Sequence, residues 1–139
     1  SSAASDVYKR QKLKSALKQA QWNVLREVAW EELWEMHSLF HTSSRPFSYW
    51  HPETLRVLKF FMERGYPSSP EFGSQSPIVT MDAGSAIHLT VLESQARFWR
   101  NLIMKEFAPL ELFEDRCGAG PRLLGPVREI QEVADVNTI

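Results

Sequence analysis

The chain has 139 residues, of which 43% are hydrophobic and 24% charged, with five Trp and eight Phe residues, a make-up typical of one packed domain and not of a disordered chain. Its 16 basic and 17 acidic residues leave a net charge of -1, so no overall field attracts nucleic acid or an anionic membrane. Cys117 is the single cysteine, which excludes an intrachain disulfide and favours a cytoplasmic location. No apolar run approaches the ~20 residues that span a bilayer, so no membrane partner is expected.

The opening segment, SSAASDVYKRQ, shows no hydrophobic period and resembles a translated sequencing adapter. We therefore expect residues 1–11 to be a non-native extension, residues 12–125 to form the domain and residues 126–139 to be a C-terminal tail. On this interpretation the chain is a fragment whose natural N-terminal part is missing. The alternative is a frayed native terminus.

Residues 12 to about 40 are predicted to be helical, in one piece or two. Apolar side chains recur there at spacings of three and four, with charged side chains on the other faces. These apolar residues are Val24, Leu25, Val28, Leu33, Met36 and Phe40. Three tryptophans, Trp22, Trp30 and Trp34, widen the apolar face, which predicts contact with more than one neighbouring element. A missing partner domain would supply one such contact.

A second helix is predicted to begin at Pro52, after an irregular connection formed by HTSSRPFSYWHP. Proline suits the first turn of a helix, His51 precedes it, and Gly65 supplies a C-terminal stop. The next segment, YPSSPEFGSQSP, is polar and rich in Pro and Gly. We expect it to be a surface loop that carries no chemistry.

Two strands are predicted at residues 78–81 and 86–92, because both segments are rich in Ile, Val, Leu and Thr. A turn around Gly84 would join them in an antiparallel hairpin. Ser94 is then expected to cap a third helix that ends near Phe107.

A short candidate strand, LELFEDR at residues 110–116, follows the third helix. The chain then ends in a segment of helical spacing that is too short to be stable without packing. Helices, two strands, a helix and a strand in this order predict an α+β fold, with helices packed on a mostly antiparallel sheet.

Several residues outside the hairpin could carry chemistry, but each fits a simpler interpretation better. His37 and His41 lie four apart, a spacing that suits zinc, yet no glutamate follows His37 and no third ligand is evident. We therefore predict no metal site. The GAGP segment at 118–121 lacks the Lys-Ser/Thr ending of a phosphate loop, so a plain turn is favoured. Cys117 is expected to be a quiet thiol.

Asp82 directly follows the first predicted strand and precedes Ala83 and Gly84. An aspartate before small residues commonly closes a strand by hydrogen bonding locally, so these residues alone favour a turn former. A positioned carboxylate can also act as an acid or a base. The wider motif bears on this choice.

The segment VTMDAGSAIHL resembles the third motif of mevalonate diphosphate decarboxylases, members of the GHMP kinase superfamily, in which a strand ends in Asp-Ala-Gly-Pro-Asn. The segment MHSLFHTSSRPFSYWHPETLRVL resembles a second stretch of that family, with His37, Pro46, Ser48 and Tyr49 at the matching places. The two motifs occur in the family's order, and the resemblance covers roughly residues 12–125.

The resemblance implies a ferredoxin-like GHMP kinase C-terminal domain that closes an active site against a missing N-terminal GHMP domain. It implies that ATP and Mg²⁺ are bound mainly by that missing domain, and it leaves a homodimer open. The implied reaction is the ATP-dependent decarboxylation of mevalonate 5-diphosphate, or 5-phosphate, to isopentenyl diphosphate, or isopentenyl phosphate. Two alternatives stay open: half of a mevalonate 3-kinase, and a standalone ferredoxin-like binding or regulatory module.

The resemblance also implies roles for individual residues. Asp82 would be catalytic, lying beside the hydroxyl of the substrate, while Ala83, Gly84, Ser85 and Tyr49 would bind substrate. One position departs from the family, because Ser85-Ala86 stands where Pro-Asn is usual. The missing asparagine leaves open whether the substrate carries one phosphate or two.

Overall fold

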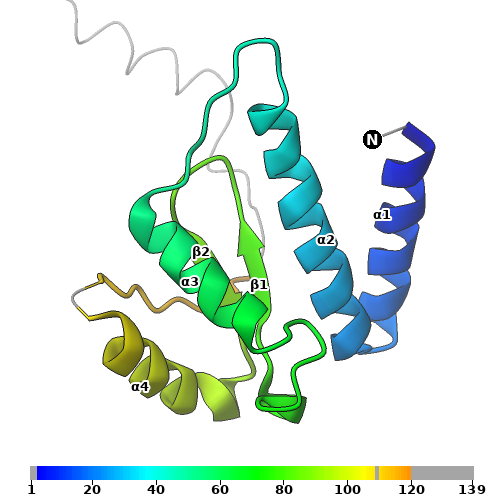
Figure 1. The fold of residues 1–139 in the computed structure, drawn as a ribbon. Helices are drawn as coiled ribbons and strands as arrows, with labels where there is room; N and C mark the ends of the chain where they lie inside the picture. Colours follow the sequence, from blue (N-terminus) through cyan, green and yellow to red (C-terminus); the bar gives the residue numbers. More distant parts are fainter. Residues whose placement is uncertain (1–2, 109, 120–139) are drawn as a thin grey trace, which may run out of the picture.

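The computed structural model describes residues 3–108 and 110–119. Four helices and a two-stranded antiparallel sheet make up this part of the chain (Figure 1). The elements are α1 (Ala3–Lys18), α2 (Trp22–His41), α3 (Pro52–Glu63), β1 (Ile78–Met81), β2 (Ile87–Thr90) and α4 (Ala96–Phe107), with short 3-10 turns at Gly73–Gln75 and Glu93–Gln95. The α+β class predicted from the sequence is confirmed. No helix within the described residues has the length and apolar character needed to cross a membrane.

The first predicted helical region forms two helices, as one of the two sequence interpretations proposed. The break lies at residues 19–21, where Ala20 has a φ of 51° in the left-handed region. Helix α1 begins at Ala3, before the expected start at residue 12, so the predicted boundary of the extension falls inside it. Figure 1 shows α1 lying along α2 at one side of the molecule. The division into extension, domain and tail stays a prediction.

Helix α3 begins and ends where the sequence predicts. The His51 side chain accepts a hydrogen bond from the Glu53 N–H, and the Thr54 hydroxyl accepts one from the His51 N–H, which together form a capping box. At the other end Gly65 has a φ of +72°, a conformation that favours glycine. Local chemistry therefore sets both ends of this helix.

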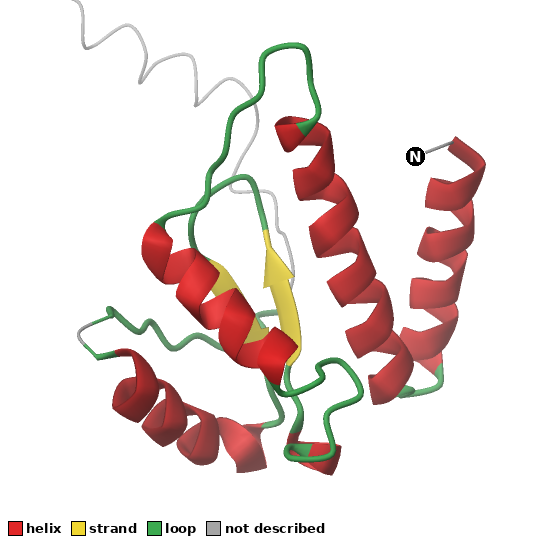
Figure 2. Cartoon of the chain, viewed as in Figure 1, coloured by secondary structure: helices red, strands yellow, loops and turns green. Residues whose placement is uncertain are grey.

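The predicted hairpin is confirmed, with a second strand shorter than expected. Strands β1 and β2 pair in antiparallel register, with Val79 opposite Leu89 and Thr80 opposite His88. Val79 is buried in β1, and Leu89 of β2 is half-buried against the same core. As Figure 2 shows, α3 runs across the hairpin.

Two of the local predictions are wrong. Ser94 does not cap α4, because it lies inside the 3-10 turn and Gln95 takes the cap position without a side-chain hydrogen bond. Residues 110–116 form no strand in the described part of the chain. Of their apolar side chains, Leu110 packs against the core, whereas Phe113 is 85% exposed. Gly118 and Ala119 lie in irregular backbone, and the rest of the GAGP segment and the tail lie outside the described residues.

The predicted polar surface loop is also only partly on the surface. Tyr66 and Phe72 from this loop are buried in the core beside Phe61, which is fully buried. Phe61 has ring contacts with Tyr66, Phe72 and Trp99 at centroid distances of 5.3, 6.1 and 5.8 Å. The polar residues around Tyr66 and Phe72 led to the prediction of a surface loop. Both aromatic side chains instead fill the space between α3, α4 and the hairpin.

Candidate active site

Asp82 lies immediately after the last residue of β1, on a turn open to solvent. Its side chain is 94% exposed. The Gly84 N–H donates a hydrogen bond to the Asp82 carbonyl oxygen over 2.8 Å, which turns the chain toward β2. A Cβ added at Gly84 would meet nothing within 4 Å, so the space in front of this turn is free. The carboxylate is therefore accessible to a ligand that approaches the end of the hairpin.

His88 is the nearest charged partner of Asp82 in the described residues. Its Nε2 lies 3.8 Å from the Asp82 Oδ2, and its side chain is 55% exposed. Sequence spacing did not single out His88, which lies six positions after Asp82 and adds no recognisable motif spacing. The hairpin register was the signal: Thr80 pairs with His88, and Asp82 follows Thr80 by two residues on the same face.

The turn after Asp82 is held from the α3 side. The Thr54 hydroxyl donates a hydrogen bond to the Ser85 carbonyl oxygen over 2.8 Å, and Thr54 itself is only 4% exposed. Ala83 and Ser85 are exposed. The structure thus places Asp82, Ala83, Gly84 and Ser85 on one accessible turn with a fixed backbone.

Tyr49 lies in the connection between α2 and α3, where it belongs to a cluster of aromatic side chains. It is 40% exposed, and its ring meets Phe40 and Phe47 at centroid distances of 5.5 and 5.3 Å. Neighbouring Ser48 accepts a hydrogen bond from the Trp50 N–H over 3.1 Å. In the part of the chain that the structure describes, no hydrogen bond joins Tyr49 to the 82–85 turn.

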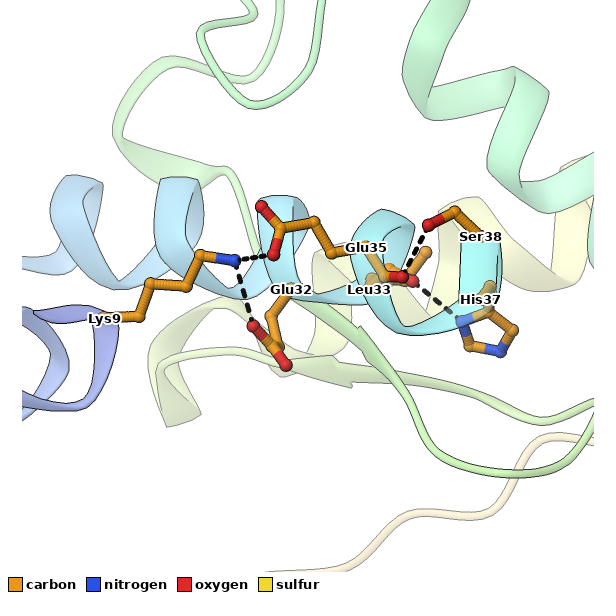
Figure 3. Close-up of polar contacts among 6 residues, drawn as sticks. All are labelled: Lys9, Glu32, Leu33, Glu35, His37 and Ser38. Atoms are coloured by element: carbon orange, nitrogen blue, oxygen red, sulfur yellow. Dashed lines mark hydrogen bonds and ion pairs between the residues drawn. The ribbon is translucent and has the colours of Figure 1, made fainter. Parts of the chain in front are cut away.

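His37 is a buried histidine with a defined tautomer. It is 1% exposed, and its Nδ1 lies 2.8 Å from the Leu33 carbonyl oxygen, as Figure 3 shows. Because a carbonyl only accepts, Nδ1 carries the hydrogen. Among the described residues the buried Nε2 has no hydrogen-bond partner, and the ring lies against Trp50 at a centroid distance of 5.4 Å. No group of three or more His, Cys, Asp or Glu residues that could hold a metal ion occurs among the described residues.

A cleft of about 580 Å³ lies between α1, α2 and one face of β1, with Asp82 among its lining residues. Its charged side chains are Asp6, Lys9, Arg10, Glu32 and Asp82; its apolar walls include Leu13, Leu17, Val28, Leu33, Met36 and Ile78. Lys9 bonds both Glu35 and Glu32 of α2, the latter over 3.2 Å (Figure 3). Burial alone would lower the pKa of Lys9, but the hydrogen bonds to Glu35 and Glu32 raise it overall. This ammonium group therefore stays charged and ties α1 to α2.

Similar solved structures include the mevalonate diphosphate decarboxylases of Legionella pneumophila, at 27% identity and a TM-score of 0.61, and of Staphylococcus aureus, at 22% identity and 0.62. Both matches cover 73% of this chain, but only 31% and 29% of the respective solved chains. A structure of MDDEF in complex with MVAPP, AMPPCP and magnesium matches 73% of this chain at 18% identity, with a TM-score of 0.60, and 29% of its own chain is covered. No family model and no curated protein sequence matches the chain.

The structural match confirms the resemblance to mevalonate diphosphate decarboxylases at the level of one domain. The chain spans about 30% of the length of the solved structures it matches. Its described fold is thus that of a domain-sized part of these larger enzymes.

Proposed function

We propose that the chain is the C-terminal part of an ATP-dependent decarboxylase that converts mevalonate 5-diphosphate, or 5-phosphate, to isopentenyl diphosphate, or isopentenyl phosphate. One observation supports this most directly: the segment that resembles the family's Asp-Ala-Gly motif forms an exposed turn at the end of β1, in a chain whose fold matches such enzymes. The turn is closed by the backbone carbonyl oxygen of Asp82, and no hydrogen bond between its carboxylate and the turn occurs among the described residues. The proposal accounts for both the motif and its position.

In this proposal Asp82 is the catalytic residue. Its carboxylate orients the tertiary hydroxyl of the substrate and accepts or directs the proton of that hydroxyl, a task that typically contributes about 10²–10⁴-fold in rate. Ala83, Gly84 and Ser85 line the approach to the carboxylate with exposed backbone and small side chains. Tyr49 binds substrate from the connection between α2 and α3.

The resemblance to the decarboxylases assigns ATP and Mg²⁺ mainly to an N-terminal GHMP domain, which we propose packs against the Asp82 side of this chain. Among the described residues, no group of three or more His, Cys, Asp or Glu side chains could hold a metal ion. The similar structure of MDDEF in complex with MVAPP, AMPPCP and magnesium supports ATP and Mg²⁺ as ligands of the complete enzyme. Further strands from the larger polypeptide would complete the hairpin into a ferredoxin-like sheet in a cytoplasmic enzyme.

The test uses a complete polypeptide in which this chain follows its N-terminal domain. Replacing Asp82 with Asn keeps the shape and the turn-forming ability but removes the charge, so turnover is expected to fall by about two to four orders of magnitude. The melting temperature should change little, because the side chain is 94% exposed. Asp115→Asn, at another exposed aspartate, is the matched control and should keep full turnover.

The products of the same assay separate the two enzyme classes. A decarboxylase releases carbon dioxide together with ADP and phosphate, whereas a 3-kinase releases ADP and leaves a phosphorylated substrate. The Ser85-Ala86 departure from Pro-Asn makes this measurement necessary with both the mono- and the diphosphate. Near-normal turnover in Asp82→Asn, or loss of activity only through unfolding, would show that Asp82 is structural.

A further inference from the structure

We infer that His88 is a positioning residue for Asp82, an assignment that rests on the proposed function. The imidazole faces one carboxylate oxygen of Asp82 and leaves the other for the substrate hydroxyl. The distance between Nε2 and Oδ2 is 3.8 Å, short enough for attraction between opposite charges and long enough to leave both groups hydrated. This arrangement gives a site that responds to the charge of His88.

The hairpin itself builds this pair. Thr80 lies directly opposite His88, and Asp82 lies two residues beyond Thr80, so Asp82 and His88 are diagonal neighbours on one face of the sheet. Val79 and Met81 point the other way and are buried in the core. A slip of one residue in the register would move His88 to the buried face, so the packing of Val79 and Met81 keeps the pair together.

Other charged side chains share the cleft with the Asp82 carboxylate. Asp6, Lys9 and Arg10 of α1 and Glu32 of α2 share the cleft that Asp82 lines. Lys9 is engaged by Glu32 and Glu35. Within the described residues, His88 is the side chain that forms an ion pair with Asp82. A histidine side chain can be neutral or cationic, so the charge state of His88 decides whether this contact is an ion pair.

The charge of His88 should control the basicity of Asp82. A protonated imidazole stabilises the carboxylate anion and so makes it a weaker proton acceptor. With a neutral imidazole beside it, Asp82 is a better base, so kcat should rise when His88 is deprotonated. Exposed ion pairs are typically worth 0.2–1 kcal/mol, so the expected rise is about 1.4- to 5-fold.

The first experiment measures the pair in the chain alone by NMR. In a pH titration, the chemical shift of the Asp82 side-chain carboxyl carbon, labelled with ¹³C, should show a separate inflection that follows the protonation of His88. His88→Gln keeps a side-chain N–H donor without the charge and should remove that inflection. His41→Gln, at an exposed histidine near Ser48, is the control and should leave it unchanged. No inflection in the wild-type chain would overturn the inference.

The second experiment measures kcat and KM against pH in the complete enzyme. The wild type and His41→Gln should show the rise in kcat, whereas His88→Gln should give a flat profile over the same range and retain activity. Superimposable wild-type and His88→Gln profiles would overturn the role of His88 while Asp82→Asn still tests the proposed function. If the complete enzyme neither decarboxylates nor phosphorylates mevalonate phosphates, the proposed function fails and the positioning role fails with it, whereas the NMR result still shows whether the pair exists.

Discussion

The Thr54 hydroxyl donates a hydrogen bond to the Ser85 carbonyl oxygen over 2.8 Å, which joins the first turn of α3 to the turn that carries Asp82. The same hydroxyl accepts the His51 N–H in the capping box. One side chain thus fixes the start of a helix and the backbone of the candidate site. A substitution that removes the Thr54 hydroxyl should therefore affect both the start of α3 and the turn that carries Asp82.

Thr54→Val should lower the free energy of unfolding by about 1–3 kcal/mol, because valine keeps the shape but leaves a part-buried carbonyl oxygen and an N–H without their partner. Urea denaturation followed by circular dichroism measures this change. Thr54→Ser keeps the hydroxyl and is the matched control, with a smaller loss. Equal stability of the valine variant and the wild type would contradict the assigned role of this bond.

The attachment of α1 to α2 should depend on Lys9. Lys9→Met removes the ion pairs with Glu32 and Glu35 and should weaken the attachment by about 0.5–1 kcal/mol, the upper range measured for ion pairs at a protein surface. Hydrogen exchange should then speed up in α1 but not in α3. Lys14→Met, at an exposed lysine of the same helix, is the control. High salt should narrow the difference between Lys9→Met and the wild type, since it screens the charges.

Tyr66 should make the protein less stable at alkaline pH. Burial, opposed by the hydrogen bond with Val79, raises the pKa of its hydroxyl from 10.0 to about 12. The unfolded chain therefore loses this proton first, so the contribution is fully present below pH ~10 and is lost as the pH rises toward ~12. Denaturation curves at increasing pH should show the decline.

Tyr66→Phe should flatten that decline, leaving only the part that Lys9 and other groups contribute. At neutral pH the variant should already be about 1–3 kcal/mol less stable, because the Tyr66 hydroxyl donates to the Pro77 carbonyl oxygen over 2.9 Å and accepts from the Val79 N–H over 3.1 Å. An unchanged alkaline slope in Tyr66→Phe would rule out Tyr66 as its source.

Phe61 should be the most sensitive position in the core. It is fully buried, so Phe61→Ala should cost about 3–5 kcal/mol through lost contacts and the cavity left behind. Phe98→Ala, at a phenylalanine that is 41% exposed, is the control and should cost far less. Thermal denaturation measures both. If Phe61→Ala does not fold, Phe61→Leu leaves a smaller cavity. Its melting temperature should still be lower than that of Phe98→Ala.

Elements governed by neighbouring residues were predictable from the sequence. Helix α3 follows from Pro52, the capping box at His51 and the positive φ of Gly65, which act within a few residues of each helix end. The hairpin follows from two runs of strand-forming residues around a turn. The motif at Asp82 is likewise a continuous stretch, so its place at the end of a strand could be read directly. The prediction of Ser94 as the cap was wrong because Glu93, Ser94 and Gln95 are all polar. Only the backbone geometry decides which of them takes the cap position of α4.

Contacts between distant segments were decided only by the tertiary structure. Tyr66 and Phe72 are surrounded by Pro, Ser and Gly, and their burial depends on the aromatic space that α3 and α4 leave between them, which no local pattern encodes. The partnership of Asp82 with His88 depends on the exact register of the hairpin, and that of Thr54 with Ser85 joins residues 31 positions apart. The sequence alone determined which residues could carry the chemistry, because motifs are local; packing determined which of them meet, because it depends on the whole core.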